Sequence, residues 1–193
     1  LVARIAALGP TFVKLAQVFS ARADLIPEPY LSRLATLTDR VPPVSWPEIQ
    51  RLIREAYGEE AETLFERIDP APVASASLGQ VHRARWRGRD VAVKILRPRI
   101  EEAVARDVKA ARRISAWAAR RWPIPHVLGF QALVEEFAAR ISEEMDFRLE
   151  AEYATEVRTN FAGNPRVVIP EVMHEMTRQR VLVLEFLDGT RVD

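Results

Sequence analysis

Two short runs of residues on either side of a glycine turn constrain the fold of this chain more than any other feature. Residues 81–86 (VHRARW) and 91–95 (VAVKI) flank the turn RGRD at 87–90. Runs rich in β-branched residues around such a turn are typical of a β-hairpin. In the second run, two valines and an isoleucine alternate with an alanine and Lys94. The alternation predicts that the lysine lies on the face of the strand opposite the apolar one.

Helices separated by prolines are predicted ahead of the hairpin. Residues 45–48 (SWPE) have the pattern of a capping box, with serine at the N-cap and glutamate three residues further on. Gly58 predicts the end of that helix. The first predicted helix begins at residues 9–11 and ends at a break at 27–29. Three more helices are predicted over about 30–37, 45–58 and 60–68.

Two long helices and two further strands are predicted after the hairpin. The first helix covers about 100–122, with acidic residues in its first turn and basic residues in its last, as the helix dipole favours. The second covers about 130–159, where apolar residues recur every four positions. Residues 166–172 and 180–187 are predicted strands. This order resembles the small lobe of a protein kinase, a five-stranded antiparallel sheet with an inserted helix.

Composition excludes several classes of function. A formal net charge of +1 lacks the basic character of a nucleic-acid-binding domain. There is no cysteine, and the three histidines are far apart, so neither a disulfide nor a zinc site is expected. No apolar run is long enough to cross a membrane, and the first residues lack a secretory signal. Because the chain begins with Leu1, we expect it to be a piece of a longer protein.

Lys94 is the first candidate for chemistry. The sequence VAVK at 91–94 matches the pattern V-A-I-K of the third kinase strand, whose lysine pairs with the phosphates of ATP. A turn of small residues is predicted over 74–80, with Gly79 fifteen residues before Lys94, and backbone N–H groups could approach a phosphate there. Taken alone, the match is weak, and a strand lysine that reaches solvent is the alternative.

Acidic residues on the second long helix are candidate partners for this lysine. In kinases a glutamate on the helix after the third strand holds the phosphate-binding lysine. Asp146 and Glu150 are four residues apart and share a face of a regular helix, with Glu143 close by. Glu144 and Asp146 would be about 200° apart, so they can serve one site only if the helix is irregular there. A solvated acidic face is the alternative.

Four motifs in order resemble the UbiB (AarF/ADCK) family of atypical protein-kinase-like proteins. Residues 74–82 (ASASLGQVH) resemble its alanine-rich loop, and residues 144–147 (EMDF) with Glu150 resemble its E-x-D element and the following glutamate. Residues 14–17 (KLAQ) resemble its K-x-G-Q signature, with Ala16 in place of glycine. Residues 181–189 (VLVLEFLDG) are similar to its last small-lobe strand and hinge. The resemblance covers almost the whole chain.

The resemblance implies a role for each matching residue. Lys94 would bind the phosphates of ATP or ADP, and Glu150 would be its ion-pair partner. Lys14 and Gln17 would reach into the active site, with Lys14 facing Glu144, and Asp146 would complete the E-x-D element. The hinge backbone near Glu185 and Leu187 would meet adenine. The loop over the phosphates would comprise Ala74, Ser75, Ala76, Ser77, Gly79 and Gln80.

We therefore expect an α+β fold, with a helical extension over residues 1–68 and a kinase-like small lobe over 69–193, and with the large lobe absent. The parent would be an atypical kinase or ATPase that supports isoprenoid-quinone biosynthesis or membrane-lipid homeostasis at the cytoplasmic face of a membrane. The residues that hold Mg²⁺ would lie in the large lobe, so this chain alone is expected to be inactive. A nucleotide-responsive scaffold without catalysis is the alternative. A purely helical membrane-surface module would not explain Lys94.

Overall fold

The computed structural model describes residues 10–20, 28–29, 32–33, 41–121 and 125–189. By its contacts the chain divides into two compact units. The helical unit comprises residues 1–41, 76–78 and 99–143, and the sheet unit comprises residues 42–75, 79–98 and 144–193. The division into two domains at residue 68 stays a prediction. Helix α4 (Trp46–Tyr57), which belongs to the predicted extension, packs with the sheet.

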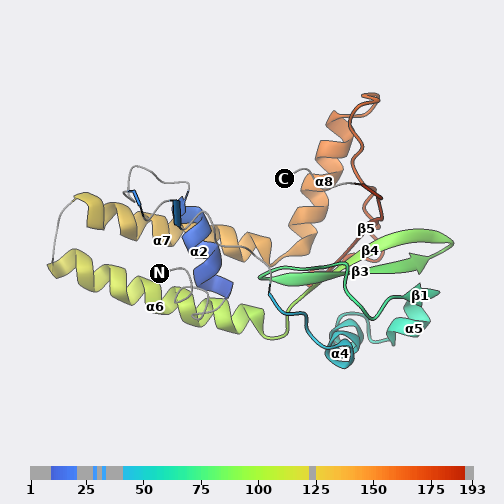
Figure 1. Cartoon of the computed structure of the whole chain (residues 1–193), viewed down its shortest axis with the longest axis horizontal. Coiled ribbons are helices and arrows are strands. Elements are labelled where there is room, and N and C mark those ends of the chain that lie inside the picture. The colour runs from blue at the N-terminus through green and yellow to red at the C-terminus, as the bar shows by residue number, and fades with distance from the viewer. Residues whose placement is uncertain (1–9, 21–27, 30–31, 34–40, 122–124, 190–193) are drawn as a thin grey trace. The chain divides into compact units, whose positions relative to one another are not determined.

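The sheet unit is built on an antiparallel sheet of five strands, which confirms the predicted α+β class (Figure 1). The order of its strands is β1-β3-β4-β5, and the short strand β2 also pairs with β3. The strands are β1 (Arg67–Ile68), β2 (Ala74–Ser75), β3 (Gly79–Trp86), β4 (Arg89–Leu96) and β5 (Val181–Glu185).

The predicted hairpin is the centre of this sheet. Val81 of β3 lies opposite Lys94 of β4, and the pairing continues to Trp86 opposite Arg89. The two residues of the turn, Arg87 and Gly88, have φ values of 48° and 74°. A two-residue hairpin of type I′ requires positive φ at both positions, which explains the glycine.

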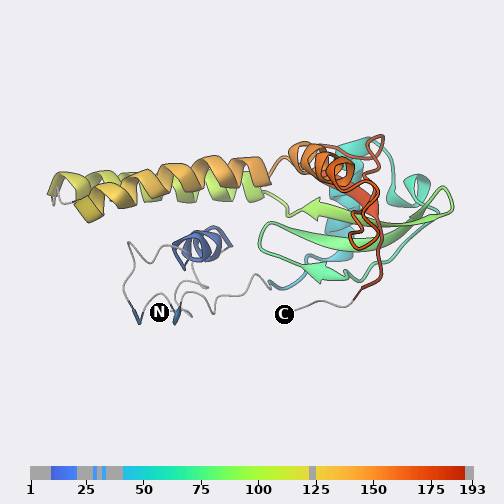
Figure 2. The ribbon, with the colours of Figure 1, turned by 90° about the horizontal axis from the view of Figure 1, so that it is seen from above.

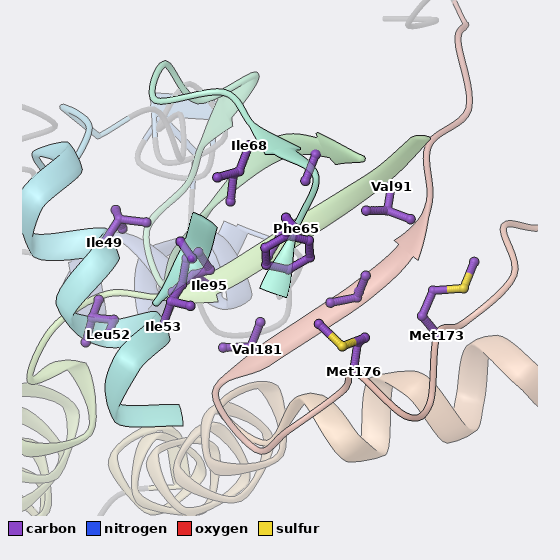
Figure 3. Packing of buried hydrophobic residues seen from close by; sticks show 14 residues of the cluster. Ile49, Leu52, Ile53, Phe65, Ile68, Val91, Ile95, Met173, Met176 and Val181 are labelled. Atoms are coloured by element: carbon purple, nitrogen blue, oxygen red, sulfur yellow. The ribbon is translucent and has the colours of Figure 1, made fainter. Parts of the chain in front are cut away.

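One face of the sheet carries the hydrophobic core, as the alternation in β4 predicts. Val91, Val93 and Ile95 are at most 1% exposed. They pack against α4 (Trp46–Tyr57), whose Ile49 and Ile53 are fully buried (Figure 3). Burial of each such side chain contributes about 1.5–3 kcal/mol. The same cluster includes Leu52, Ala61, Phe65, Ile68, Ala84, Met173, Met176, Val181 and Val183.

The ends of α4 agree only in part with the capping-box pattern. Ser45 is the N-cap residue, but its side chain makes no capping hydrogen bond. The Glu48 carboxylate instead pairs with Arg51 at 2.6 Å, and the pKa of Glu48 is lowered by this hydrogen bond. The reciprocal capping box is therefore wrong. Gly58 ends the helix as predicted, with a φ of 75° and its N–H donated to the Arg54 carbonyl.

Two predicted elements are wrong in the sheet unit. The helix expected over residues 60–68 is only α5 (Ala61–Leu64), because Arg67 and Ile68 pair with β3 as strand β1. Residues 166–172 form no strand; they contribute one isolated bridge, from Val172 to Leu184. Prolines at 165 and 170 cannot donate to a sheet, which limits pairing in this segment.

The long insertion between β4 and β5 contains three helices where two were predicted. They are α6 (Ile100–Arg121), α7 (Pro125–Glu144) and α8 (Phe147–Asn160). The predicted helix over 130–159 is broken because Asp146 is the N-cap of α8, with extended backbone and a carboxylate that accepts from the N–H of Arg148. The periodicity of apolar residues continues across this break and conceals it.

The helical unit contains α2 (Pro10–Ser20), α6 and most of α7. Figure 2 shows α6 and α7 side by side, and Arg112 of α6 binds Glu135 of α7 at 2.7 Å. In α2, Val13, Leu15 and Ala16 are buried. The helix predicted over 30–37 lies almost wholly outside the described residues. No helix in the part of the chain that the structure describes is long and apolar enough to span a membrane.

Candidate functional site

The ammonium group of Lys94 is held by two partners within the sheet unit. Its Nζ donates to both carboxylate oxygens of Glu150, each at 2.7 Å. The same Nζ lies 4.7 Å from the centroid of the Phe147 ring, a favourable cation–π contact. The side chains of Lys94 and Glu150 remain 34% and 43% exposed. A positive charge is thus fixed in position but still open to solvent and to a ligand.

Phe147 is a site residue that our reading of the sequence passed over. It is the first residue of α8 and only 1% exposed, and its N–H donates to the carbonyl of Gln179 at 2.9 Å. This bond anchors the start of α8 close to the beginning of β5, while Glu150 follows one turn later. The signal in the sequence was an aromatic residue directly after Asp146, an N-cap type of residue.

Asp146 and Glu144 do not share the contact with Lys94. The Asp146 carboxylate accepts from the Arg148 guanidinium at 2.6 Å and from the Arg148 backbone N–H at 3.1 Å. The hydrogen bond from the Arg148 side chain lowers the pKa of Asp146. Glu144 is the last residue of α7 and is exposed. The break between α7 and α8 thus places Glu144 at the end of one helix and Asp146 at the N-cap of the next.

The residues predicted to enter the site from the extension belong to the helical unit. Lys14 is half-buried in α2, and Gln17 follows in the same helix. Because Lys14 and Glu144 lie in different units, the pairing of the two stays a prediction.

The predicted phosphate loop is fixed at its two ends within the sheet unit. The Ser75 hydroxyl accepts from Arg97 at 2.8 Å, and Arg97 also donates to the Pro42 carbonyl at 3.0 Å. Ala74 and Gly79 lie in the paired strands β2 and β3. A Cβ atom at Gly79 would lie 2.6 Å from the Ile95 carbonyl oxygen, so only glycine fits. Ala76 and Ser77 group with the helical unit.

Gln80 has a structural role that its place in the loop motif conceals. It is 1% exposed, and its amide oxygen accepts from the Val44 N–H at 2.8 Å. Its amide nitrogen lies 2.9 Å from Nε2 of His82 and donates to it, because Nδ1 of His82 must donate to the Asp69 carbonyl at 2.8 Å. Burial lowers the pKa of His82. The side chain of Gln80 is therefore fully occupied inside the protein.

The hinge backbone is partly used within the sheet unit. The N–H of Glu185 donates to the Glu171 carbonyl at 2.8 Å, and the N–H of Phe186 donates to the Asp90 carbonyl at 3.0 Å. The Glu185 side chain accepts from the Glu171 N–H. Leu187 is 42% exposed, and the contact of the hinge backbone with adenine stays a prediction.

No metal site accompanies this arrangement in the described residues. Among them, no group of three or more His, Cys, Asp or Glu side chains could hold a metal ion.

Comparison with known proteins links this chain to one family. Residues 36–193 match the model of the ABC1 atypical kinase-like domain. A probable protein kinase UbiB from Aeromonas hydrophila is 39% identical over 188 residues, and one from Aeromonas salmonicida is 38% identical over the same length. Each alignment covers 96% of this chain but 34% of the relative, so the chain spans about a third of the length of these relatives.

A solved structure extends the likeness to three dimensions. The complex of Rv3197 with erythromycin, from Mycobacterium tuberculosis, matches with a TM-score of 0.62 and 30% sequence identity. The match covers 90% of this chain and 44% of that one.

Proposed function

Because this chain belongs to the ABC1 atypical kinase-like family, we propose that it supplies the phosphate-binding half of a nucleotide site in a longer atypical kinase or ATPase. The observation that carries the proposal is the position of Lys94, whose ammonium is held by Glu150 and by the ring of Phe147. The ion pair alone would add little to the stability of the fold, since pairs that are open to solvent contribute at most about 1 kcal/mol.

The residues divide the work of binding a nucleotide. Lys94 is a compact cation that can contact phosphate oxygens while Glu150 keeps it from turning to solvent. Phe147 fixes the direction from which the ammonium approaches. Backbone N–H groups of the loop that ends at Gly79 would face the phosphates, and the hinge at Leu187 would face the base. Mg²⁺, bound with the nucleotide, would neutralise phosphate charge with ligands from outside this chain.

Replacement of Lys94 by alanine tests the proposal. In the full-length protein, Mg-ATP at 100 times its Kd should stabilise the native state by about 2.7 kcal/mol, measured as a thermal shift. Lys94→Ala should lose most of this shift at the same ATP concentration. Lys109→Ala is the matched control, because Lys109 is an exposed lysine of α6 in the helical unit.

Each outcome of this experiment decides something. A shift that Lys109→Ala retains and Lys94→Ala loses supports nucleotide binding through this site. The absence of a shift in the unchanged protein, or a full shift in Lys94→Ala, contradicts it. Release of phosphate from ATP by the unchanged protein favours the enzyme; binding without any turnover favours the alternative, a nucleotide-responsive scaffold.

We further propose that the whole protein works at a membrane surface, in quinone biosynthesis or lipid homeostasis, as the family resemblance implies. The exposed part of α6 supports this proposal. Ile114 and Trp117 are 60% and 61% exposed, with Arg113 and Arg120 also exposed beside them. Aromatic and aliphatic side chains flanked by arginines are typical of helices that lie on anionic lipid.

Sedimentation with lipid vesicles tests this surface. The full-length protein should co-sediment with phosphatidylglycerol vesicles. The double variant Ile114→Ser/Trp117→Ser should have an affinity for these vesicles at least about fivefold lower. The matched control is Val157→Ser/Val168→Ser, which removes two exposed apolar side chains from the sheet unit. Equal losses in both variants, or no loss in the first, would contradict a role for α6.

A further inference from the structure

The face of the sheet that carries Lys94 is distinct from the face that carries the core. Residues directly opposite each other in neighbouring strands share a face. Val81 lies opposite Lys94, and Arg83 lies opposite Ala92. Ala92 in turn lies opposite Leu184 of β5. These residues, half-buried rather than sealed in the core, form a continuous surface from Lys94 toward the turn of the hairpin.

Arg83 closes this surface at the end away from the phosphate loop. Its guanidinium carbon lies 4.5 Å from the centroid of the Phe186 ring, and its Nη2 donates to the Asp90 carboxylate at 2.5 Å. The backbone carbonyl of Asp90 accepts from the N–H of Phe186 at 3.0 Å. The hydrogen bond from Arg83 lowers the pKa of Asp90. Asp90 thus holds both members of the stacked pair.

The order of residues along β3 gives this cluster a direction. The strand begins at Gly79, at the end of the predicted phosphate loop, and then passes Val81, opposite Lys94, before it reaches Arg83. Two residues of a strand span about 7 Å. With the phosphates at Gly79 and Lys94, a nucleoside that follows the strand extends over Ala92 toward Arg83. Phe186 belongs to the hinge segment and stands at the same end.

We propose that Arg83, stacked on Phe186, borders the base of the bound nucleotide and determines how strongly the base contributes to binding. This inference rests on the proposed nucleotide site. The Arg83 side chain is 39% exposed, so part of its planar guanidinium is available to a ligand. A guanidinium stacks on flat aromatic groups and donates hydrogen bonds to their acceptor atoms, which the ammonium of lysine cannot do in the same way.

Two ligands separate a contact with the base from a contact with the phosphates. Mg-ATP has a base, and Mg-tripolyphosphate has none. In the full-length protein, Arg83→Ala should raise the Kd for Mg-ATP roughly tenfold, the size expected for one lost stacking contact. The same variant should leave the Kd for Mg-tripolyphosphate within about twofold. Lys94→Ala should raise the Kd for both ligands. Isothermal titration calorimetry measures the Kd of the unchanged protein and of each variant for both ligands.

Further variants separate stacking from charge and from folding. Arg83→Lys keeps the positive charge but removes the planar guanidinium. It should therefore raise the Kd for Mg-ATP nearly as much as Arg83→Ala does. Phe186→Leu removes the aromatic ring on which Arg83 stacks. It should likewise raise the Kd for Mg-ATP and leave the Kd for Mg-tripolyphosphate almost unchanged. Arg85→Ala is the matched control: Arg85 lies two residues further along β3, and its guanidinium pairs with Glu66 and Asp90. It should change neither Kd.

The outcomes are distinguishable. If the unchanged protein binds neither ligand, the proposed function fails and this inference with it. If the protein binds both, but Arg83→Ala weakens both equally, Arg83 is structural and the inference alone is overturned. Full affinity in Arg83→Lys, or an equal loss in Arg85→Ala, would also overturn it, because charge rather than stacking would then account for the effect. Should Arg83→Ala fail to fold, a non-selective result for Phe186→Leu overturns the inference by itself.

Discussion

Replacement of Phe147 by alanine is expected to lower the free energy of unfolding of the sheet unit by about 3–5 kcal/mol, the usual range for a fully buried phenylalanine. The ring is 1% exposed and lies beneath the ammonium of Lys94. Its removal leaves a cavity at the first residue of α8, beside the bond from the Phe147 N–H to Gln179. It also removes the support that sets the direction of Lys94.

Native-state hydrogen exchange of the amides in β3, β4 and β5 measures this loss in the sheet unit itself. Phe161→Ala is the matched control, because Phe161 directly follows α8 and is 44% exposed. It should change the stability by no more than about 0.5 kcal/mol. A loss below about 1 kcal/mol for Phe147→Ala would show that the ring is not packed as described.

The variant Phe147→Leu separates packing from the contact with the cation. Leucine retains much of the apolar volume, so the cost in stability should fall to about 1.5 kcal/mol. The cation–π contact with Lys94 is nevertheless lost. A weaker affinity for Mg-ATP in this folded variant would therefore report on the ring itself. An unchanged affinity would mean that Glu150 alone positions the lysine.

The hairpin and the placement of Lys94 could be predicted from the sequence because they depend on local alternation. Val91, Val93 and Ile95 face the core, and this puts Lys94 on the other side without any knowledge of the rest of the chain. The predicted partner, Glu150, came from the family resemblance rather than from spacing. It lies 56 residues away from Lys94, and no local pattern joins the two.

The elements that were mistaken are those in which distant pairing or a cap overrides periodicity. The apolar stripe continues from Met145 to Leu149 across the break, and only the N-cap at Asp146 shows that the helix is interrupted there. Strand β1 is two residues long and exists because Arg67 and Ile68 meet β3. The local sequence around these two residues indicates only the adjacent helix, because the pairing depends on residues far away in the chain.

Gln80 shows the same limit at the candidate site, where the family motif indicated a residue of the phosphate loop. Its amide contacts the backbone of Val44, 36 residues earlier, and the buried ring of His82. Gln80→Leu should lower the free energy of unfolding of the sheet unit by about 3–5 kcal/mol. The loss is expected because each buried polar group left without a partner costs about 1–3 kcal/mol. The groups affected are Nε2 of His82 and the N–H and carbonyl of Val44.

Hydrogen exchange in β3, compared with Mg-ATP affinity, decides between the structural role of Gln80 and a direct role in binding. Gln50→Leu is the matched control, since the amide of Gln50 binds Glu62 at 2.7 Å at the surface of α4. Its cost should stay below about 1 kcal/mol because water replaces the lost partner. If Gln80→Leu leaves β3 as stable as this control does but weakens Mg-ATP, the amide serves the ligand. A large loss of stability instead places Gln80 in the framework that holds the start of β3, and with it Gly79 and the end of the phosphate loop.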